Sequence, residues 1–471
     1  MDENFINRKK EIAWFEERYE AAKKEGQLLV VYGKRRVGKT ELVKHFAKDK
    51  PFVYYVAEKQ TAKAQLQAAT KAFAEGFRAP ELANARFNGW RELFMYISRE
   101  IQKRTEPVIV VVDEFPYLAQ SDKGMSSYFQ AGWDEHLKDK KILLILMGSS
   151  ISMMYKHALV YSAPLYGRRT GQWLLQPFTF EETKKFYPDA SFAKVFPLYA
   201  LSGGIPAYAR VFNGKFSLEE NLKQYVFPEG RFLAVEPELL LSEEFDDPRS
   251  YLSILKAIGL GRTKFSEIVQ ESQLPSTALP GYIKTLINLR LIVKGTPITD
   301  PIPEKSKKGA YSLADSFLRF YFSFIYPNIS LIKADSYDAL FKQHGEILTQ
   351  LIAKSYENTS AEFIQMAIQS GALPHFEELG RWWNKDTEID LVGLNKQDNT
   401  ILFVETKWNS KPIGTDALNN LKKKAQQVEW GKEDRKEYFA LIAKGGFTEE
   451  LKEQAKREKV TLIQEDHLLA F

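Results

Sequence analysis

Two carboxylates and a lysine interrupt an apolar stretch near the C-terminal end of the sequence. Residues 388–408 read as two strands joined by a polar turn at 395–400. A turn centred there places Asp390 directly opposite Glu405 in an antiparallel pair, and Lys407 projects to the same face. Opposed carboxylates repel each other unless a cation lies between them. The pattern therefore predicts a divalent cation on oxygen ligands, which suit Mg²⁺ or Mn²⁺.

The lysine gives this site a chemical use. Lys407 could stabilise the charge that develops on an attacked phosphodiester, or help to position the attacking water. We therefore interpret Asp390 and Glu405 as metal ligands, and all three side chains as catalytic residues for the cleavage of DNA. The alternative is a hairpin with solvated carboxylates on an exposed face. The almost unbroken apolar residues of both strands disfavour it, because they indicate cover on both faces of the sheet.

A second chemical motif lies near the N-terminus. A strand at 28–32 precedes a G-x-x-x-x-G-K-T loop, and an amphipathic helix begins at Thr40, which is the context that a P-loop requires. Backbone N–H groups of such a loop close around phosphate oxygens. We predict that the loop binds ATP, with Lys39 at the β- and γ-phosphates and Thr40 on Mg²⁺. The predicted phosphate-binding residues are Gly33, Lys34, Arg35, Arg36, Val37, Gly38, Lys39 and Thr40.

An acidic pair extends this prediction from ATP binding to hydrolysis. Residues 107–115, PVIVVVDEF, predict a strand buried on both faces that ends in Asp113 and Glu114. Open α/β sheets bind ligands at the C-terminal ends of their strands. Asp113 would therefore support Mg²⁺, and Glu114 would polarise the attacking water. Acidic residues also end strands in ordinary surface loops, but the P-loop upstream disfavours that interpretation.

Further apolar segments complete a predicted parallel sheet. They cover residues 51–57 and 141–150, and Ser149 at the end of the second could sense the γ-phosphate by hydrogen bonding. Arg168 and Arg169 precede one more short strand. A guanidinium there could stabilise transition-state charge, including the charge in a neighbouring subunit of a homo-oligomer. Ordinary surface ion pairs are the alternative, and both interpretations stay open.

Six stretches of the first half of the chain carry a resemblance to a known family: FINRKKEI, GKRRVGKT, VVVDEFPYL, LMGSSISMM, LYGRRTGQ and SGGIPAY. Together they resemble the archaeal-type ATPase family, on the AAA/STAND side of the P-loop ATPases. The resemblance implies a helical lid that opens at GGIP, residues 203–206. It also implies that the segment before the first strand contacts adenine, which makes Phe5 and Arg8 candidate nucleotide ligands.

Beyond an acidic link at 242–250, three short amphipathic helices and a hairpin predict a winged helix. The third helix could enter a major groove, with Lys305, Lys307 and Lys308 of the hairpin tip on phosphates. That helix carries only two positive charges, however, and winged helices of such ATPases also serve as internal or protein-contact modules. DNA contact by this region and an internal role both stay open.

The C-terminal motif also carries a resemblance. GRWWNKDTEIDLVGLN and ILFVETKW are similar to the domain of unknown function that usually follows this ATPase, itself similar to PD-(D/E)xK nucleases. The resemblance implies a further metal ligand, a glutamate from an upstream helix. Glu357 matches by position, with Glu362 and Glu346 as alternatives.

Composition bounds these interpretations. The 471 residues contain no cysteine, which excludes a disulfide framework, a thiolate zinc site and a cysteine nucleophile. The N-terminus reads as a charged amphipathic helix, and the apolar runs fall short of the ~20 residues of a membrane span. We expect a cytoplasmic protein without membrane contact. The net charge of +5 permits nucleic-acid contact without arguing for it.

The expected fold class is multidomain α/β. We predict a P-loop ATPase core at 1–180, a helical lid at 181–245, a winged helix at 246–330 and a restriction-endonuclease-like α/β domain at 331–471. The predicted function is an ATP-hydrolysing AAA/STAND-like ATPase coupled to metal-dependent cleavage or binding of DNA. The alternatives are a nucleotide-dependent switch or scaffold with a silent nuclease fold, and a chaperone-like regulator without a nucleic-acid role.

Overall fold

The computed structural model describes all residues except 1–4, 84, 246, 304–305, 307 and 470–471. The chain forms two compact units. Unit 1 comprises residues 1–178 with 205–207, and unit 2 comprises residues 179–204 with 208–471. The predicted finer division into lid, winged helix and C-terminal domain lies within unit 2 except for residues 205–207 of the lid, and it stays a prediction. In the described ranges, no helix is both long enough and apolar enough to cross a membrane.

Unit 1 contains the predicted parallel sheet, in the strand order β2-β3-β4-β1-β5. Its central strands are buried throughout, as their β-branched and leucine-rich sequences predict. The strands are β1 (Gln27–Tyr32), β2 (Phe52–Val56), β3 (Val108–Asp113), β4 (Ile142–Gly148) and β5 (Gly171–Leu174).

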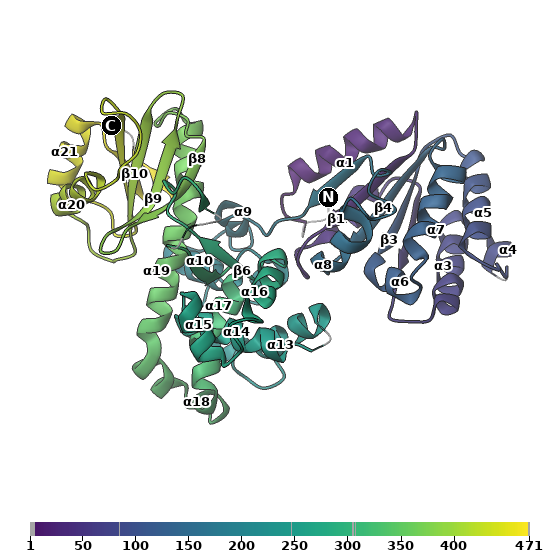
Figure 1. Cartoon of the computed structure of the whole chain (residues 1–471), viewed down its shortest axis with the longest axis horizontal. Helices are drawn as coiled ribbons and strands as arrows, with labels where there is room; N and C mark the ends of the chain where they lie inside the picture. The colour runs from purple at the N-terminus through teal and green to yellow at the C-terminus, as the bar shows by residue number, and fades with distance from the viewer. Residues whose placement is uncertain (1–4, 84, 246, 304–305, 307, 470–471) are drawn as a thin grey trace. The chain divides into compact units, whose positions relative to one another are not determined.

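Helices cover both faces of this sheet (Figure 1). One face packs on α3, α5, α6 and α7 in a continuous apolar core. On the other face, Phe15 of α1 stacks on Phe46 of α2, so α1 packs against the helix that follows the P-loop. The helices are α1 (Lys9–Ala22), α2 (Lys39–Ala47), α3 (Ala62–Phe77), α4 (Pro80–Ala83), α5 (Trp90–Gln102), α6 (Phe115–Ser121), α7 (Met125–Gly132), η1 (Trp133–Leu137), α8 (Ile151–Met154) and η2 (Tyr155–Leu159).

Unit 2 begins with helices and contains the three-helix and hairpin order expected for residues 246–330. A two-stranded hairpin follows α16, with Ile292 paired to Leu313. Lys308 at its tip is exposed, whereas Lys305 and Lys307 lie outside the described residues. The elements are α9 (Phe180–Lys184), α10 (Phe192–Ser202), α11 (Pro206–Ala209, across the boundary), α12 (Leu218–Tyr225), α13 (Phe232–Glu244), α14 (Arg249–Gly259), α15 (Phe265–Ser272), α16 (Leu279–Asn288), β6 (Ile292–Gly295) and β7 (Ala310–Leu313).

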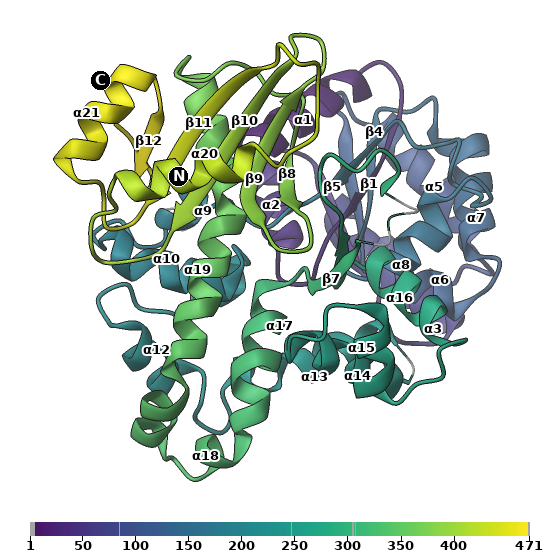
Figure 2. The same cartoon turned by 60° about the vertical axis from the view of Figure 1, so that its left-hand side comes forward.

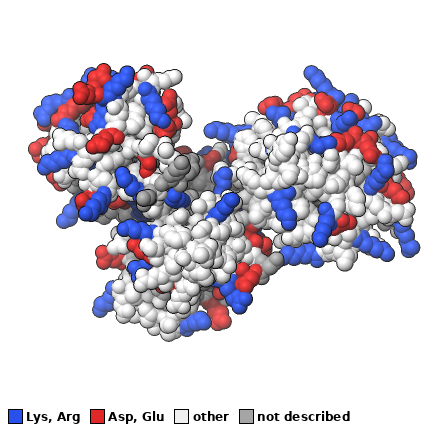
Figure 3. Space-filling model, in the orientation of Figure 1, with Lys and Arg blue, Asp and Glu red and all other residues white. Residues whose placement is uncertain are grey.

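On the face that Figure 3 shows, charge does not single out the three-helix region. Figure 3 shows Lys and Arg side chains interspersed with Asp and Glu over the visible face of the chain. A nucleic-acid footprint would be a stripe of one sign. The winged helix and its DNA contact therefore stay predictions.

The C-terminal part of unit 2 is a mixed sheet in the order β13-β12-β11-β10-β9-β8. Helix α20 covers one face and the long helix α19 lies behind the other (Figure 2). The elements are α17 (Ser316–Phe320), η4 (Tyr321–Ile325), η5 (Tyr326–Asn328), α18 (Ile329–Lys333), α19 (Tyr337–Gln369), β8 (Glu378–Trp383), β9 (Glu388–Asn395), β10 (Thr400–Lys407), α20 (Thr415–Ala425), β11 (Lys436–Ala443), α21 (Glu449–Glu458), β12 (Thr461–Gln464) and β13 (His467–Leu468).

Candidate functional site

The P-loop wraps around its own lysine. Lys39 is buried, and its Nζ donates to the carbonyl oxygens of Gly33 at 2.9 Å and Lys34 at 3.1 Å. A side chain at position 33 would lie 2.5 Å from the carbonyl oxygen of Leu175, so only glycine fits there. Gly38 has φ +95°, the left-handed backbone that lets the loop turn into α2. The motif thus forms a preshaped loop with a cation at its centre.

Beside this loop, Asp113 is a buried carboxylate with three donors. Its Oδ2 accepts from Thr40 Oγ1 at 2.8 Å and also from the hydroxyl of Tyr54, while its Oδ1 accepts from the backbone N–H of Glu114 at 2.9 Å. Oxygen donors from a hydroxyl and a carboxylate fit Mg²⁺ chemically. Burial, and then Asp113, raise the pKa of Tyr54, so the phenol stays a donor. Tyr54 is a member of the site that the sequence analysis missed.

Glu114 and Ser149, from the ends of neighbouring strands, form a second pair. Ser149 donates its Oγ to Glu114 Oε1 at 2.7 Å and its N–H to Oε2 at 3.2 Å. Glu114 itself has φ +50°, a left-handed conformation that is uncommon outside glycine. A strained backbone and two hydrogen bonds together fix the direction of this carboxylate. The predicted contact of Ser149 with a γ-phosphate stays a prediction.

Phe5 and Arg8 lie close to the P-loop and the helix that follows it. Arg8 donates from Nη2 to the carbonyl oxygen of Val37 at 3.0 Å, and its guanidinium lies 4.1 Å from the ring centroid of Phe178. The Phe5 ring stacks on His45 of α2, with centroids 3.8 Å apart. These contacts fasten the N-terminal segment to the nucleotide loop. Contact of either residue with adenine stays a prediction.

Arg168 and Arg169 make structural contacts. Arg168 forms an ion pair with Asp134, with Nη2 3.0 Å from Oδ2. Arg169 donates from Nη1 to the carbonyl oxygens of Ala158 at 3.1 Å and Leu159 at 3.2 Å, which satisfies the C-terminal end of η2. The contact of Arg168 suits the ion-pair alternative, whereas Arg169 bonds to backbone carbonyl oxygens. The transition-state role, and the homo-oligomer that it would require in trans, stay predictions.

The C-terminal hairpin has the predicted register. The pairs run from Thr400 opposite Asn395 to Val404 opposite Leu391, and continuing that register brings Asp390 opposite Glu405. Both carboxylates are buried. Asp390 Oδ2 accepts the backbone N–H of Thr406 at 2.8 Å, which fixes its orientation.

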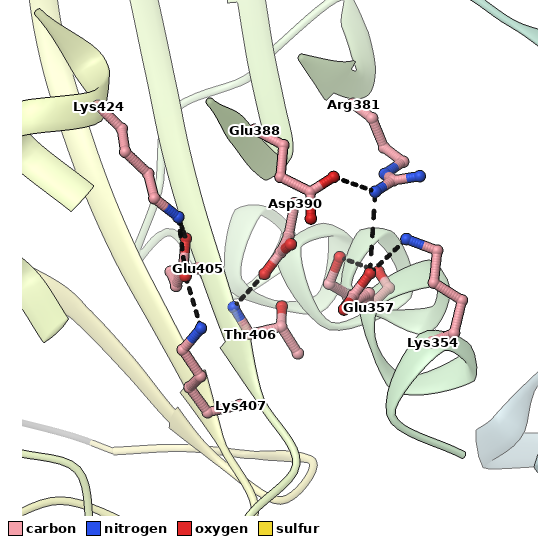
Figure 4. A network of polar contacts seen from close by, with 10 residues as sticks. Lys354, Glu357, Arg381, Glu388, Asp390, Glu405, Thr406, Lys407 and Lys424 are labelled. Atoms are coloured by element: carbon pink, nitrogen blue, oxygen red, sulfur yellow. Dashed lines mark hydrogen bonds and ion pairs between the residues drawn. The ribbon is translucent and has the colours of Figure 1, made fainter. Parts of the chain in front are cut away.

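Two lysines neutralise Glu405 (Figure 4). Lys407 Nζ lies 2.6 Å from Glu405 Oε1, and Lys424 of α20 lies 3.0 Å from Oε1 and 2.8 Å from Oε2. A cleft of about 840 Å³ opens beside them and is also lined by Lys423 and Asn420. The site is therefore richer in cations than the sequence predicted, since Lys424 was not anticipated.

Glu357 of α19 reaches the same neighbourhood. It pairs with Lys354 at 2.5 Å and approaches Arg381 of β8 at 4.0 Å, and Arg381 also pairs with Glu388 at 3.0 Å (Figure 4). Burial first, and then the charges of Glu357 and Glu405, raise the pKa of Asp390 to about 7. The predicted carboxylates thus share one electrostatic environment.

The two alternatives to Glu357 lie elsewhere. Glu362 accepts the N–H of Phe180 at 3.0 Å and the hydroxyl of Tyr199 at 3.2 Å, and Glu346 is exposed beside Gln350. Among the residues with described positions, no group of three or more His, Cys, Asp or Glu side chains is arranged to hold a metal ion. The donor chemistry suits Mg²⁺ or Mn²⁺, but a cation would have to compete with Lys407 and Lys424 for Glu405.

Neutralising Asp390 by mutation should raise the free energy of unfolding, compared with wild type, more at alkaline pH than at acid pH. Because its pKa is raised on folding, the folded chain holds the proton more tightly, and stability is lost as pH rises from about 4 to about 7. Asp390→Asn removes this loss and can still accept from Thr406. In EDTA, its advantage over wild type should be larger at pH 8 than at pH 4, by on the order of 1 kcal/mol or more. Denaturant unfolding at both pH values measures this; parallel pH profiles would contradict it.

Comparisons with known proteins find an ATPase family for the N-terminal part of the chain. Residues 5–209 match a family described as an ATPase domain predominantly from Archaea, and residues 321–427 match archaeal and bacterial proteins of unknown function. An uncharacterised protein of Methanocaldococcus jannaschii is 33% identical over 448 residues, 93% of this chain and 95% of that protein. A Walker-type ATPase of Pyrococcus abyssi is 21% identical, with a TM-score of 0.51 over 68% of this chain and 97% of that one, a likeness of fold alone.

Proposed function

This chain belongs to the family of ATPases found predominantly in Archaea, and from that premise we propose that unit 1 binds ATP with Mg²⁺ and hydrolyses it. The observation that carries the proposal is the hydrogen bond from Thr40 to the buried carboxylate of Asp113, beside a P-loop closed around Lys39. In this arrangement, Lys39 neutralises the β- and γ-phosphates, and Thr40 and Asp113 support the metal.

Glu114 supplies the general base of the proposed reaction. Its carboxylate is held by Ser149 at the C-terminal end of β3, the edge at which such sheets bind ligands. There it can accept a proton from the water that attacks the γ-phosphorus. Bound Mg²⁺ would neutralise charge on the phosphate oxygens. Phosphate release from ATP by the full chain, with Mg²⁺ or with EDTA, tests the proposal.

Removing the P-loop ammonium should abolish tight nucleotide binding. Lys39→Ala deletes the charge that would meet the phosphates, and we expect ATP affinity to fall at least about tenfold, the scale of a charged hydrogen bond. Titration with a fluorescent ATP analogue measures this. Lys48→Ala is the matched control, because Lys48 follows the same helix at its C-terminal end and is exposed. Equal ATP affinity of the Lys39 variant and wild type would contradict the proposed ATP site at the P-loop.

For the C-terminal sheet of unit 2, we propose metal-dependent cleavage of DNA. The proposal is supported by Asp390, Glu405 and Lys407 gathered at one end of β9 and β10 beside a lysine-lined cleft. Asp390 and Glu405 would hold Mg²⁺ or Mn²⁺, which would act as a Lewis acid on the phosphodiester. Lys407 would stabilise the developing negative charge. The predicted coupling of ATP hydrolysis to this site belongs to the same proposal.

A second function, a nucleotide-dependent switch whose nuclease-like sheet is silent, is favoured by one observation. Glu405 is already neutralised by two lysines, which a metal would have to displace. Incubation of linear, circular and single-stranded DNA with Mg²⁺ or Mn²⁺, with and without ATP, separates the two. Cutting supports the nuclease, and salt-sensitive binding without cutting supports a silent DNA-binding switch. A lack of both would favour a regulator without DNA.

A further inference from the structure

Tyr54 comes from β2, a strand that contains none of the motif residues. Alternation along β2 buries Val53 and Tyr55 on one face and turns Tyr54 to the other. The parallel register pairs Tyr54 with Val111 and Val56 with Asp113. Tyr54 therefore lies on the same face as Asp113, on the neighbouring strand and level with the residue two positions before Asp113.

The ring of Tyr54 is held from two sides, independently of its hydroxyl. Lys44 of α2, one turn beyond Thr40, places its Nζ 4.8 Å from the ring centroid, and Phe52 packs beside it with centroids 5.8 Å apart. The hydroxyl is thereby directed at Asp113 Oδ2, the oxygen that also accepts from Thr40. A phenylalanine would keep the ring contacts and lose only this donor.

We propose that Tyr54 is a positioning residue for the Mg²⁺ that accompanies bound ATP. The inference rests on the proposed ATP site and adds to it a residue outside the nucleotide motifs. With Mg²⁺ present, the Thr40 oxygen must face the metal while its hydrogen still points to Asp113. Tyr54 and the Glu114 N–H hold the two carboxylate oxygens from other directions, so the orientation of Asp113 does not depend on Thr40 alone.

The consequence is a specific effect on metal-assisted binding. Without metal, nucleotide affinity depends on the P-loop backbone and Lys39, whereas the Tyr54 hydroxyl bonds to Asp113. With metal, affinity also depends on a correctly aimed Asp113. Loss of the phenol hydroxyl should therefore reduce the gain in affinity that Mg²⁺ provides and leave metal-free affinity unchanged.

The test compares Tyr54→Phe with Tyr55→Phe in the full chain. Tyr55 is the matched control, because its hydroxyl bonds to Gln65 of α3 on the opposite face. Affinity for a fluorescent ATP analogue is measured in Mg²⁺ and in EDTA. For Tyr54→Phe we expect metal-free affinity within about twofold of wild type and a Mg²⁺-dependent gain reduced about tenfold, the scale of a hydrogen bond to a charged group. For Tyr55→Phe we expect both affinities to match wild type.

Each of these results in the variants would overturn the inference: an unchanged Mg²⁺-dependent gain in Tyr54→Phe, an equal loss with and without metal, or the same loss in Tyr55→Phe. A wild-type chain with no Mg²⁺-dependent gain would overturn it too. These readouts are independent of turnover. If wild type binds ATP with Mg²⁺ but does not hydrolyse it, the proposed activity fails while the role of Tyr54 is still decided by its own variant.

Discussion

Glu114→Gln should bind ATP as wild type does and hydrolyse it at least about 100-fold more slowly, the usual contribution of a general base. Glutamine keeps the size of the side chain and one oxygen that can accept from Ser149, so the loop geometry survives. It cannot take a proton from water. Phosphate release under saturating ATP, together with equilibrium binding of ATP, measures the two properties separately.

The matched control for this variant is Glu106→Gln, an exposed carboxylate just before the opposite end of β3. It changes the net charge by the same amount without approaching the P-loop, and its turnover should equal that of wild type. Normal turnover by Glu114→Gln would assign the base to another residue. Loss of ATP binding by the same variant would show that Glu114 acts mainly by holding the loop, through its left-handed backbone and its contacts with Ser149.

Motif residues of the nucleotide site could be predicted because their local geometry constrains their type. Gly33 has no room for a side chain, and Gly38 adopts a left-handed backbone, so the loop conformation requires glycine at both positions. The parallel sheet was predictable for a similar reason, since strands buried on both faces must be continuously apolar. The register of the C-terminal hairpin followed from the length and position of its polar turn.

The residues that were missed acquire their roles only through tertiary contact. Tyr54 reads as an ordinary aromatic residue of a strand, and its partner Asp113 is set by the neighbouring parallel strand 59 positions later. Lys424 belongs to a run of three lysines that reads as a solvated helix face. Only the packing of α20 on the sheet turns this one lysine toward Glu405. Neither the Tyr54–Asp113 contact nor the Lys424–Glu405 contact can be predicted from the spacing of residues in the sequence.

If the C-terminal sheet is a nuclease, Asp390→Asn and Lys407→Met should each lower metal-dependent DNA cleavage by at least about 100-fold. Asparagine keeps the acceptor for the Thr406 N–H but removes the anionic ligand. Methionine keeps the aliphatic stem of Lys407 and removes the charge beside Glu405. Gel analysis of DNA products with Mn²⁺ measures the loss. ATP hydrolysis should be unchanged in both variants, because neither residue belongs to unit 1.

Lys411→Met is the matched control, since Lys411 is exposed shortly after β10 and is not among the residues that line the cleft. Cleavage that persists in Lys407→Met at the wild-type level would come from another site or from a contaminant. Cleavage that Lys411→Met also loses would trace the effect to surface charge and DNA binding, which added salt would imitate. A wild-type chain that hydrolyses ATP but never cuts DNA would indicate that Lys407 and Lys424 keep a metal ion from Glu405, so that the site is catalytically silent. The nucleotide-dependent switch would then be the favoured function.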